Sequence, residues 1–257
     1  MATKFTGWQN IRTIQSTEIL TELLEAKNEY RVLTIICDTG LGKTYNVDLF
    51  AERNKKQVYK VTVGDTHNLM YVLQELMEQL GMRAWQGKNS RYRCLRDITT
   101  KLIELNEMGV HPVVILDEME NAKNPLLKAL KQLYDAVVNK CSLVLIGTHQ
   151  LIDILEKKSR WQSIPQLKRR LKAGTRYITP LNKAKHFKPF FDAHSVPGDV
   201  QDMLFDIADN YGELHDYLEP VLRRCAAKNI ELTKEEFCRY HKLPMTKQFI
   251  NTKTNAA

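Results

Sequence analysis

The 257-residue sequence has no apolar stretch that approaches the ~20 residues a helix needs to cross a bilayer. Its first residues, MATKFTGWQNIR, contain no apolar segment of the kind found in secretory signals, which predicts a cytoplasmic protein. The five cysteines form no C-x-x-C pair, and no spacing of histidine and cysteine suggests zinc. These absences argue against a disulfide framework and indicate free thiols in a reducing compartment.

Acidic residues are missing from long parts of a chain whose net charge is +8. Eleven Lys or Arg and no Asp or Glu lie between Lys157 and Lys188. The stretch MRAWQGKNSRYRCLR, residues 82–96, is also basic and has no acid. Unbalanced positive charge attracts polyanions, nucleic acid first. The alternative is that some of these residues form solvated helix faces or subunit contacts.

Short apolar runs rich in β-branched residues alternate with segments of helical periodicity. The runs predict five strands, at residues 31–38, 57–63, 112–118, 142–148 and 175–181. Unbroken apolar strands separated by helices predict an α/β fold, a parallel sheet covered on both faces. Beyond Pro180 only helical patterns follow, at 183–193, 199–210, 213–228 and 233–241. We therefore predict an α/β core (1–181), a small helical lid (182–244) and a disordered tail (245–257).

The stretch CDTGLGKT, residues 37–44, differs by one residue from the phosphate-binding loop G-x-x-x-x-G-K-[ST], because Cys37 replaces the first glycine. The first glycine stands at the strand exit, where a small side chain is tolerated. Gly40 and Gly42 allow close approach of a phosphate, Lys43 supplies charge and Thr44 a hydroxyl for Mg²⁺. The predicted nucleotide-binding residues are Asp38, Thr39, Gly40, Leu41, Gly42, Lys43, Thr44 and Tyr45.

The stretch VVILDE, residues 113–118, has the form of a buried strand that ends in two carboxylates. Asp117 is placed to hold Mg²⁺ together with Thr44, and Glu118 to polarise an attacking water. The alternative is a helix N-cap pair that follows a core strand. With the phosphate loop, this pattern predicts the cofactors ATP and Mg²⁺ and the activity of a Mg-dependent ATPase in which Lys43 and Glu118 are catalytic.

These motifs resemble those of AAA+ ATPases, and more narrowly the target-selection ATPases of DNA transposition, the phage Mu transposition protein B group and its TnsC/TniB relatives. The matching segments are DTGLGKT, VVILDEME, LVLIGTHQL and QLKRRLKAGTRYITPL, which together span about residues 30–181. The resemblance implies an ATP-dependent homo-oligomer or helical filament on double-stranded DNA. It also implies a cognate transposase as partner and little preference for DNA sequence.

The resemblance further assigns roles to residues outside the phosphate loop. The strand between the two motifs ends in a polar sensor, here Thr148 or His149, although Thr148 would serve equally as a helix cap. An arginine that completes the neighbouring subunit's site is Arg170, with Arg169 and Arg160 as the alternatives. His215 stands where a lid arginine is expected, and is otherwise a core or surface histidine. The implied DNA-binding residues are Lys88, Arg91, Arg93 and Lys123.

Two other functions fit the same motifs. One is a helicase loader or initiator ATPase, which often has an additional helical insertion or a dedicated DNA-binding domain. The other is a nucleotide-switched ATPase whose positive charge faces a protein partner or a membrane. Stimulation of ATP hydrolysis by DNA separates the DNA-binding functions from the last one.

Overall fold

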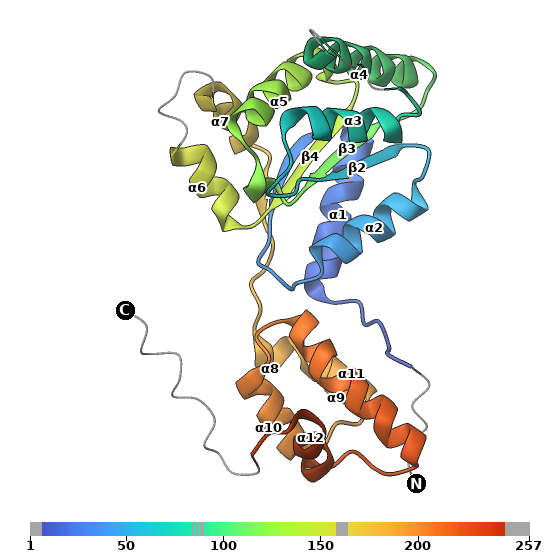
Figure 1. Ribbon diagram of the computed structural model, residues 1–257, viewed down its shortest axis with the longest axis vertical. Helices are drawn as coiled ribbons and strands as arrows, with labels where there is room; N and C mark the ends of the chain where they lie inside the picture. Colours follow the sequence, from blue (N-terminus) through green and yellow to red (C-terminus); the bar gives the residue numbers. More distant parts are fainter. Residues whose placement is uncertain (1–6, 84, 86, 88–89, 158–163, 245–257) are drawn as a thin grey trace. The chain divides into compact units, whose positions relative to one another are not determined.

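The computed structural model describes residues 7–83, 85, 87, 90–157 and 164–244 (Figure 1). They form two compact units, residues 14–180 and residues 7–13 with 181–244. Residues 7–13, which we predicted as part of the α/β core, therefore belong to the helical unit. The predicted disordered tail, 245–257, lies outside the described residues.

The first unit contains a five-stranded sheet in which every strand pair is parallel. Its strands are β1 (Val32–Ile36), β2 (Val58–Thr62), β3 (Val113–Asp117), β4 (Ser142–Gly147) and β5 (Thr175–Tyr177). The order β2-β3-β4-β1-β5 confirms the predicted parallel sheet and places β4 between the strands that precede the two motifs. β5 ends earlier than predicted, but Ile178 still donates its N–H to the carbonyl of Ile36 at 2.9 Å.

Helices cover both faces of this sheet, as predicted (Figure 1). One face carries α1 (Ile14–Glu29) and α2 (Lys43–Arg53). The other carries α3 (Leu69–Gln79), α5 (Asn124–Val137) and α7 (Ile164–Lys172), and α4 (Ser90–Glu107) packs on α3 and α5. A 3-10 turn, η1 (Met119–Asn121), follows β3, and α6 (His149–Lys157) follows β4.

The core explains why β3 and β4 are unbroken apolar runs. Every residue of both strands is buried, because helices pack on each face of the central strands. Val114, Leu116, Leu143 and Leu145 join the apolar side chains of α3, α4 and α5 in one cluster. Burial of this cluster is the main stabilising term of the unit.

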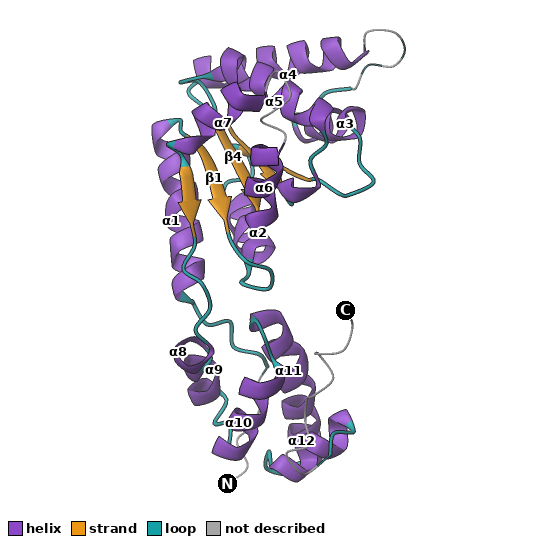
Figure 2. Ribbon diagram, turned by 90° about the vertical axis from the view of Figure 1, so that its left-hand side faces the viewer, coloured by secondary structure: helices purple, strands orange, loops and turns teal. Residues whose placement is uncertain are grey.

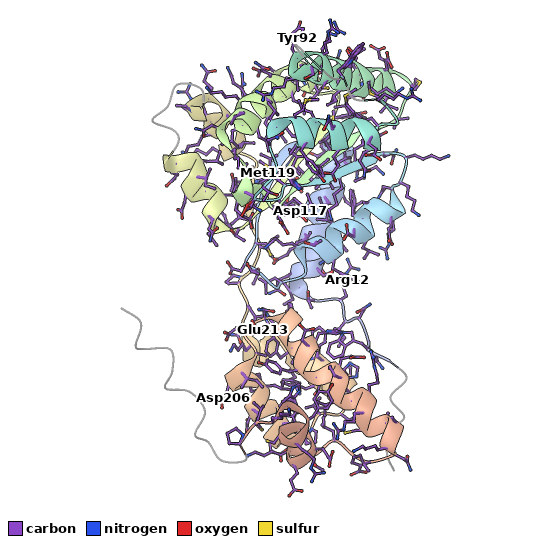
Figure 3. The ribbon with its side chains drawn as sticks, viewed as in Figure 1. Arg12, Tyr92, Asp117, Met119, Asp206 and Glu213 are labelled. Carbon is purple, nitrogen blue, oxygen red and sulfur yellow. The ribbon has the colours of Figure 1, made fainter. Side chains whose placement is uncertain are left out.

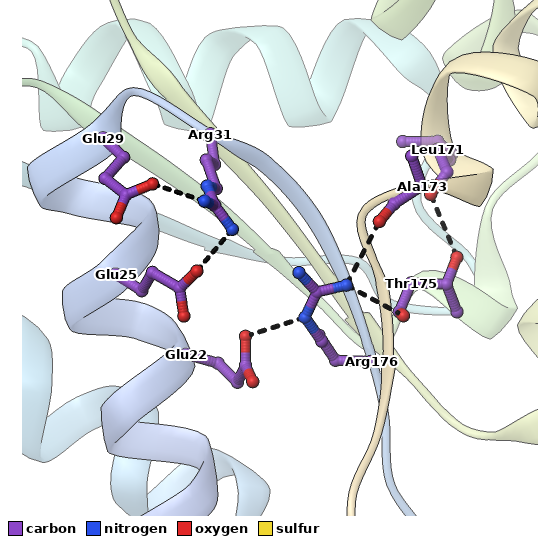
Figure 4. A network of polar contacts seen from close by, with 8 residues as sticks. All are labelled: Glu22, Glu25, Glu29, Arg31, Leu171, Ala173, Thr175 and Arg176. Atoms are coloured by element: carbon purple, nitrogen blue, oxygen red, sulfur yellow. Dashed lines mark hydrogen bonds and ion pairs between the residues drawn. The ribbon is translucent and has the colours of Figure 1, made fainter.

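A polar network connects α1 with the edge strand β5 (Figure 4). Arg176 of β5 lies 3.2 Å from a carboxylate oxygen of Glu22 and donates to the carbonyl of Ala173 at 3.1 Å. On the same helix Glu25 and Glu29 form ion pairs with Arg31, which directly precedes β1. Arg176, one of the cations in the basic stretch 157–188, is therefore paired with a carboxylate of its own chain.

In the second unit, the described residues form helices and no strands (Figure 2). The helices are α8 (Lys183–His186), α9 (Lys188–Ala193), α10 (Gly198–Ile207), α11 (Tyr211–Lys228) and α12 (Lys234–His241). The single helix predicted at 183–193 is wrong, because Pro189 lies in the first turn of α9 and interrupts the helix at Phe187. None of the described helices has both the length and the apolar character that crossing a membrane would require.

Candidate functional site

The phosphate-loop segment leaves the carboxyl end of β1 and enters α2 at Lys43. Gly40 and Gly42 have φ of 76° and 82°, a region in which a side chain is strained. The amide of Asn46 donates to the Gly42 carbonyl at 2.7 Å, and Ser16 of α1 donates to the Asn46 side chain at 2.5 Å. Both loop glycines thus have a backbone conformation that only glycine adopts easily, and Ser16 of α1 helps to hold the loop in place.

Lys43 lies over this loop. Its ammonium donates to the carbonyls of Cys37 and Asp38, at 2.8 and 3.0 Å. A phosphate bound by the loop would meet this ammonium together with the first N–H groups of α2. The arrangement has the donors that a polyphosphate chain needs.

Cys37, in place of the first glycine of the motif, is a core residue. Its side chain is buried, and its backbone N–H donates to the carbonyl of Gly147 at 3.0 Å, which extends the pairing of β1 with β4. Burial raises the pKa of the Cys37 thiol to about 11, against a smaller opposing effect of Lys43. The thiol is therefore neutral at physiological pH and acts as a small apolar side chain.

Thr44 and Asp117 meet where α2 begins and β3 ends. The Thr44 hydroxyl donates to Oδ2 of Asp117 at 3.3 Å, and Oδ1 accepts the N–H of Glu118 at 2.9 Å. Asp117 is fully buried and lies inside the sheet unit, as Figure 3 shows. A hydroxyl and a carboxylate are hard oxygen donors of the kind that Mg²⁺ prefers. The pair predicted from two distant motifs is thus in direct contact.

Glu118 follows with a strained backbone. Its φ is 56° and its ψ 41°, the left-handed region that residues other than glycine seldom occupy. The side chain is exposed, and one carboxylate oxygen lies 3.5 Å from the amide nitrogen of Asn121. The same Asn121 amide donates to the carbonyl of Val63, after β2, at 2.9 Å. Strain of this kind is typical of functional positions.

Thr148 directly follows β4, between the motif-bearing strands. Its N–H donates to Oε2 of Glu120 at 3.2 Å. Its hydroxyl oxygen is buried and has no hydrogen-bond partner among the described residues. Buried polar groups are nearly always paired, so this hydroxyl suits a ligand group. His149 is exposed, with its ring 3.7 Å from Asp38 and stacked on Tyr177 at 5.8 Å between centroids.

The predicted arginines differ in their surroundings. Arg170 forms an ion pair with Asp135 and lies over the ring of Tyr134, 5.0 Å from its centroid, both on α5 of its own chain. Arg169, the residue before it on α7, is exposed. Arg160 lies outside the described residues.

The start of α4 carries exposed cations from the basic stretch 82–96. Arg91 and Arg93 are exposed, and the Arg93 guanidinium lies 5.1 Å from the ring centroid of Trp85. The indole N–H donates to Asp97 at 2.6 Å, and this hydrogen bond lowers the pKa of the Asp97 carboxyl. Tyr92, 68 % exposed, lies on α4 away from Asp117 (Figure 3). Lys88 lies outside the described residues, and Lys123 is exposed just before α5.

His215 lies in the helical unit. Its ring makes an edge contact with Trp8, 4.8 Å between centroids, and its Nδ1 lies 3.0 Å from Asp216. Trp8 also stacks on His194, whose pKa is lowered by burial. These contacts explain why residues 7–13 belong to this unit.

Sequence reasoning missed three residues around the nucleotide site. Glu120 and Asn121 belong to DEMEN, where a polar pair one residue beyond the two motif carboxylates is a usable signal. Lys60 lies in the middle of β2 and gave no signal, because only the pairing of β2 with β3 brings it near Asp117.

Comparison with known proteins identifies a family and a similar fold. Residues 26–155, half of the chain, match the AAA domain family. The ORC2 protein of Aeropyrum pernix, solved as ADPNP–ADP complexes, is similar at a TM-score of 0.59 and 16% identity, over 88% of this chain and 65% of that chain. This chain therefore spans less than two thirds of that protein's length. A structure of Drosophila ORC bound to DNA is similar at a TM-score of 0.43 and 13% identity, over 67% of this chain and 97% of that one. No curated protein matches the sequence.

Proposed function

Because the chain belongs to the AAA domain family, we propose that it is an ATP-dependent ATPase that oligomerises on double-stranded DNA and delivers this DNA to a transposase. One observation carries the nucleotide part of the proposal. The adjacent parallel strands β3, β4 and β1 place polar residues at their carboxyl ends, the edge where α/β sheets bind ligands. At this edge Thr44 contacts Asp117, and the Thr148 N–H donates to Glu120. Lys43 and Glu118 are the direct neighbours of the first pair in the sequence.

The side chains at this edge divide the work by their chemistry. Lys43 and the loop N–H groups bind the phosphates, and Thr44 with Asp117 holds Mg²⁺, which would neutralise phosphate charge when bound. Glu118, exposed beside them, orients a water molecule and draws its proton. The unpartnered Thr148 hydroxyl donates to the terminal phosphate or to that water. Donor chemistry and the orphaned hydroxyl both fit a magnesium nucleotide.

We propose that α7 supplies the arginine that completes a neighbouring subunit's site. Arg170 was the stronger candidate in the sequence, but in its own chain it is held by Asp135 and Tyr134. Arg169 is exposed and needs no contact broken to reach a neighbour. The structure therefore favours Arg169, and Arg170 would act in trans only after release from α5.

The DNA part of the proposal rests on the start of α4. Arg91 and Arg93 are exposed cations, and the nearby Asp97 already accepts from Trp85 and Arg96. The net positive charge is thus available to phosphates. Lys123, exposed before α5, and Lys88 extend the proposed set. Contacts of this type do not read base sequence.

Delivery to a transposase rests on the resemblance of the segments at 30–181 to transposition ATPases. A second candidate, an initiator or helicase loader, is favoured by the fold likeness to the Aeropyrum pernix ORC2 protein. A gene for an integrase-type transposase beside this one would favour delivery. Target-directed strand transfer, reconstituted with that transposase, would then depend on this protein and ATP if the first candidate is right.

The experiment that tests the shared part is ATP hydrolysis with and without duplex DNA of random sequence. We expect DNA to stimulate hydrolysis and ATP to strengthen DNA binding. Hydrolysis that ignores DNA would instead favour a nucleotide-switched interaction protein. A lack of ATP binding would overturn the nucleotide assignment itself.

A further inference from the structure

The carboxyl group at the end of β3 has no access to solvent. Asp117 is 0% exposed, and its neutral partners are the Thr44 hydroxyl and the N–H of Glu118. Two such hydrogen bonds do not offset the cost of removing a full negative charge from water. A positive charge is therefore required nearby whenever no metal is bound.

Lys60 supplies that charge from the neighbouring strand. Lys60 and Thr62 are two residues apart on β2, so their side chains lie on the same face of the sheet. Thr62 is paired with Asp117 on β3, and Lys60 is therefore close to this carboxylate along the strand. The Lys60 ammonium lies 3.8 Å from Oδ2 of Asp117, the oxygen that also accepts from Thr44. In the part of the chain that the structure describes, Lys60 is the one cation within 4.0 Å of this carboxylate.

Lys60 also has a second, closer partner. Its ammonium lies 2.5 Å from Oδ1 of Asp48 on α2, the helix that begins at Lys43. The Lys60 side chain is only 15% exposed, whereas that of Asp48 is 53% exposed. The Lys60 ammonium thus lies within ion-pair distance of two carboxylates, the buried one of Asp117 and the exposed one of Asp48.

We infer that Lys60 is the counter-ion of Asp117 in the metal-free site, and that it passes this role to the divalent cation and stays with Asp48. The inference rests on the proposal that Thr44 and Asp117 hold Mg²⁺. Its consequence is that Lys60 weakens metal binding, since its charge stabilises the metal-free carboxylate and repels a cation placed there. Lys60 is a positioning residue that sets how much Mg²⁺ is needed before the metal strengthens nucleotide binding.

The test is the ratio of the ADP dissociation constants without Mg²⁺ and at one fixed Mg²⁺ concentration below saturation, where the ratio follows metal affinity, measured by calorimetry. Lys60→Met keeps the apolar stem and removes the charge, so this ratio should rise at least about threefold above wild type. Asp48→Asn removes the competing carboxylate and leaves Lys60 to Asp117 alone, so the ratio should fall. Lys60→Arg keeps the charge and should stay near wild type.

The two variants move the ratio in opposite directions, which a loss of packing cannot do. If Lys60→Met leaves the ratio unchanged or lowers it while wild type is coupled, the assignment of Lys60 is overturned. If Lys60→Met does not fold, Asp48→Asn alone decides by the sign of its change. If wild-type ADP binding ignores Mg²⁺, the proposed metal site fails instead.

Discussion

The Glu120 carboxylate accepts a hydrogen bond from the backbone N–H of Thr148 at 3.2 Å. This bond joins the turn after β3 to the start of α6, so that the segment bearing Glu118 and the segment bearing the Thr148 hydroxyl are fixed together. The fit is tight, because a Cβ at Gly147 would lie 2.7 Å from Oε2 of Glu120. The two ends of the proposed catalytic edge are thus connected through one carboxylate.

Glu120→Ala should remove this connection. The N–H of Thr148, the residue before α6, loses its acceptor, which costs about 1 kcal/mol and lowers the melting temperature by about 2–4 °C. Hydrolysis should fall further than ATP binding, because Thr148 is displaced from Glu118. Differential scanning calorimetry and steady-state hydrolysis measure the two effects. Glu104→Ala, on the exposed side of α4, is the matched control and should change neither. Equal loss of binding and hydrolysis would show that Glu120 has only a structural role.

Lys43→Ala and Glu118→Gln should separate binding from chemistry. Lys43 meets phosphate in the ground state, so its loss should weaken ATP binding on the order of a hundredfold. Glu118 acts on water, so Glu118→Gln should bind ATP normally and hydrolyse it roughly 10²–10⁴-fold more slowly. Fluorescent-nucleotide titration and phosphate release give the two quantities. Wild-type turnover by Glu118→Gln would remove this residue from the catalytic role.

The fold could be predicted from the sequence because its signals are local. The strands β1 to β4 are short apolar runs, and the loop glycines coincide with positive φ at Gly40 and Gly42. The interruption of the helix at Phe187 was not predicted, because the helical periodicity of residues 183–193 was a stronger signal than Pro189. Lys60 and the Arg170–Asp135 pair could not be found, since each depends on side chains brought together from separate elements.

Cys37 should make stability depend on alkaline pH. The pKa of the Cys37 thiol is 9.0 in the unfolded chain and about 11 in the folded protein, so the folded protein keeps the proton to a higher pH. The contribution is complete below pH 9 and is lost as pH rises to about 11, up to about 2–3 kcal/mol. Urea unfolding at pH 8 and pH 10.5 should therefore show a smaller decrease in the free energy of unfolding for Cys37→Ala than for wild type.

Cys37→Gly should bind ATP within tenfold of wild type, because glycine is the usual residue at this loop position. A greater loss of ATP affinity would contradict the assignment of this loop position.

Arg91→Ala should weaken binding to all duplex sequences alike. If Arg91 meets one phosphate, the slope of log affinity against log salt should decrease by about one unit. Hydrolysis without DNA should not change, because α4 begins away from the nucleotide edge. Fluorescence anisotropy at several salt concentrations measures the slope. Arg53→Ala, an exposed arginine at the end of α2, is the control and should keep the wild-type slope. If Arg91→Ala has the same slope as Arg53→Ala and the wild type, the exposed arginines of α4 bind another partner and not DNA.

The last prediction concerns the arginines of α7. Arg170→Ala breaks its ion pair with Asp135 and the contact with Tyr134, so it should lower the melting temperature of the monomer by about 2–4 °C. Arg169→Ala should leave the monomer's stability and ATP binding intact and stop hydrolysis, because only a neighbour's site needs it. Mixing Arg169→Ala with Glu118→Gln subunits should restore activity, since some interfaces then pair an intact Glu118 with an intact Arg169. Rescue by the Arg170→Ala mixture instead would move the trans role to Arg170, and rescue by neither would remove α7 from the shared site.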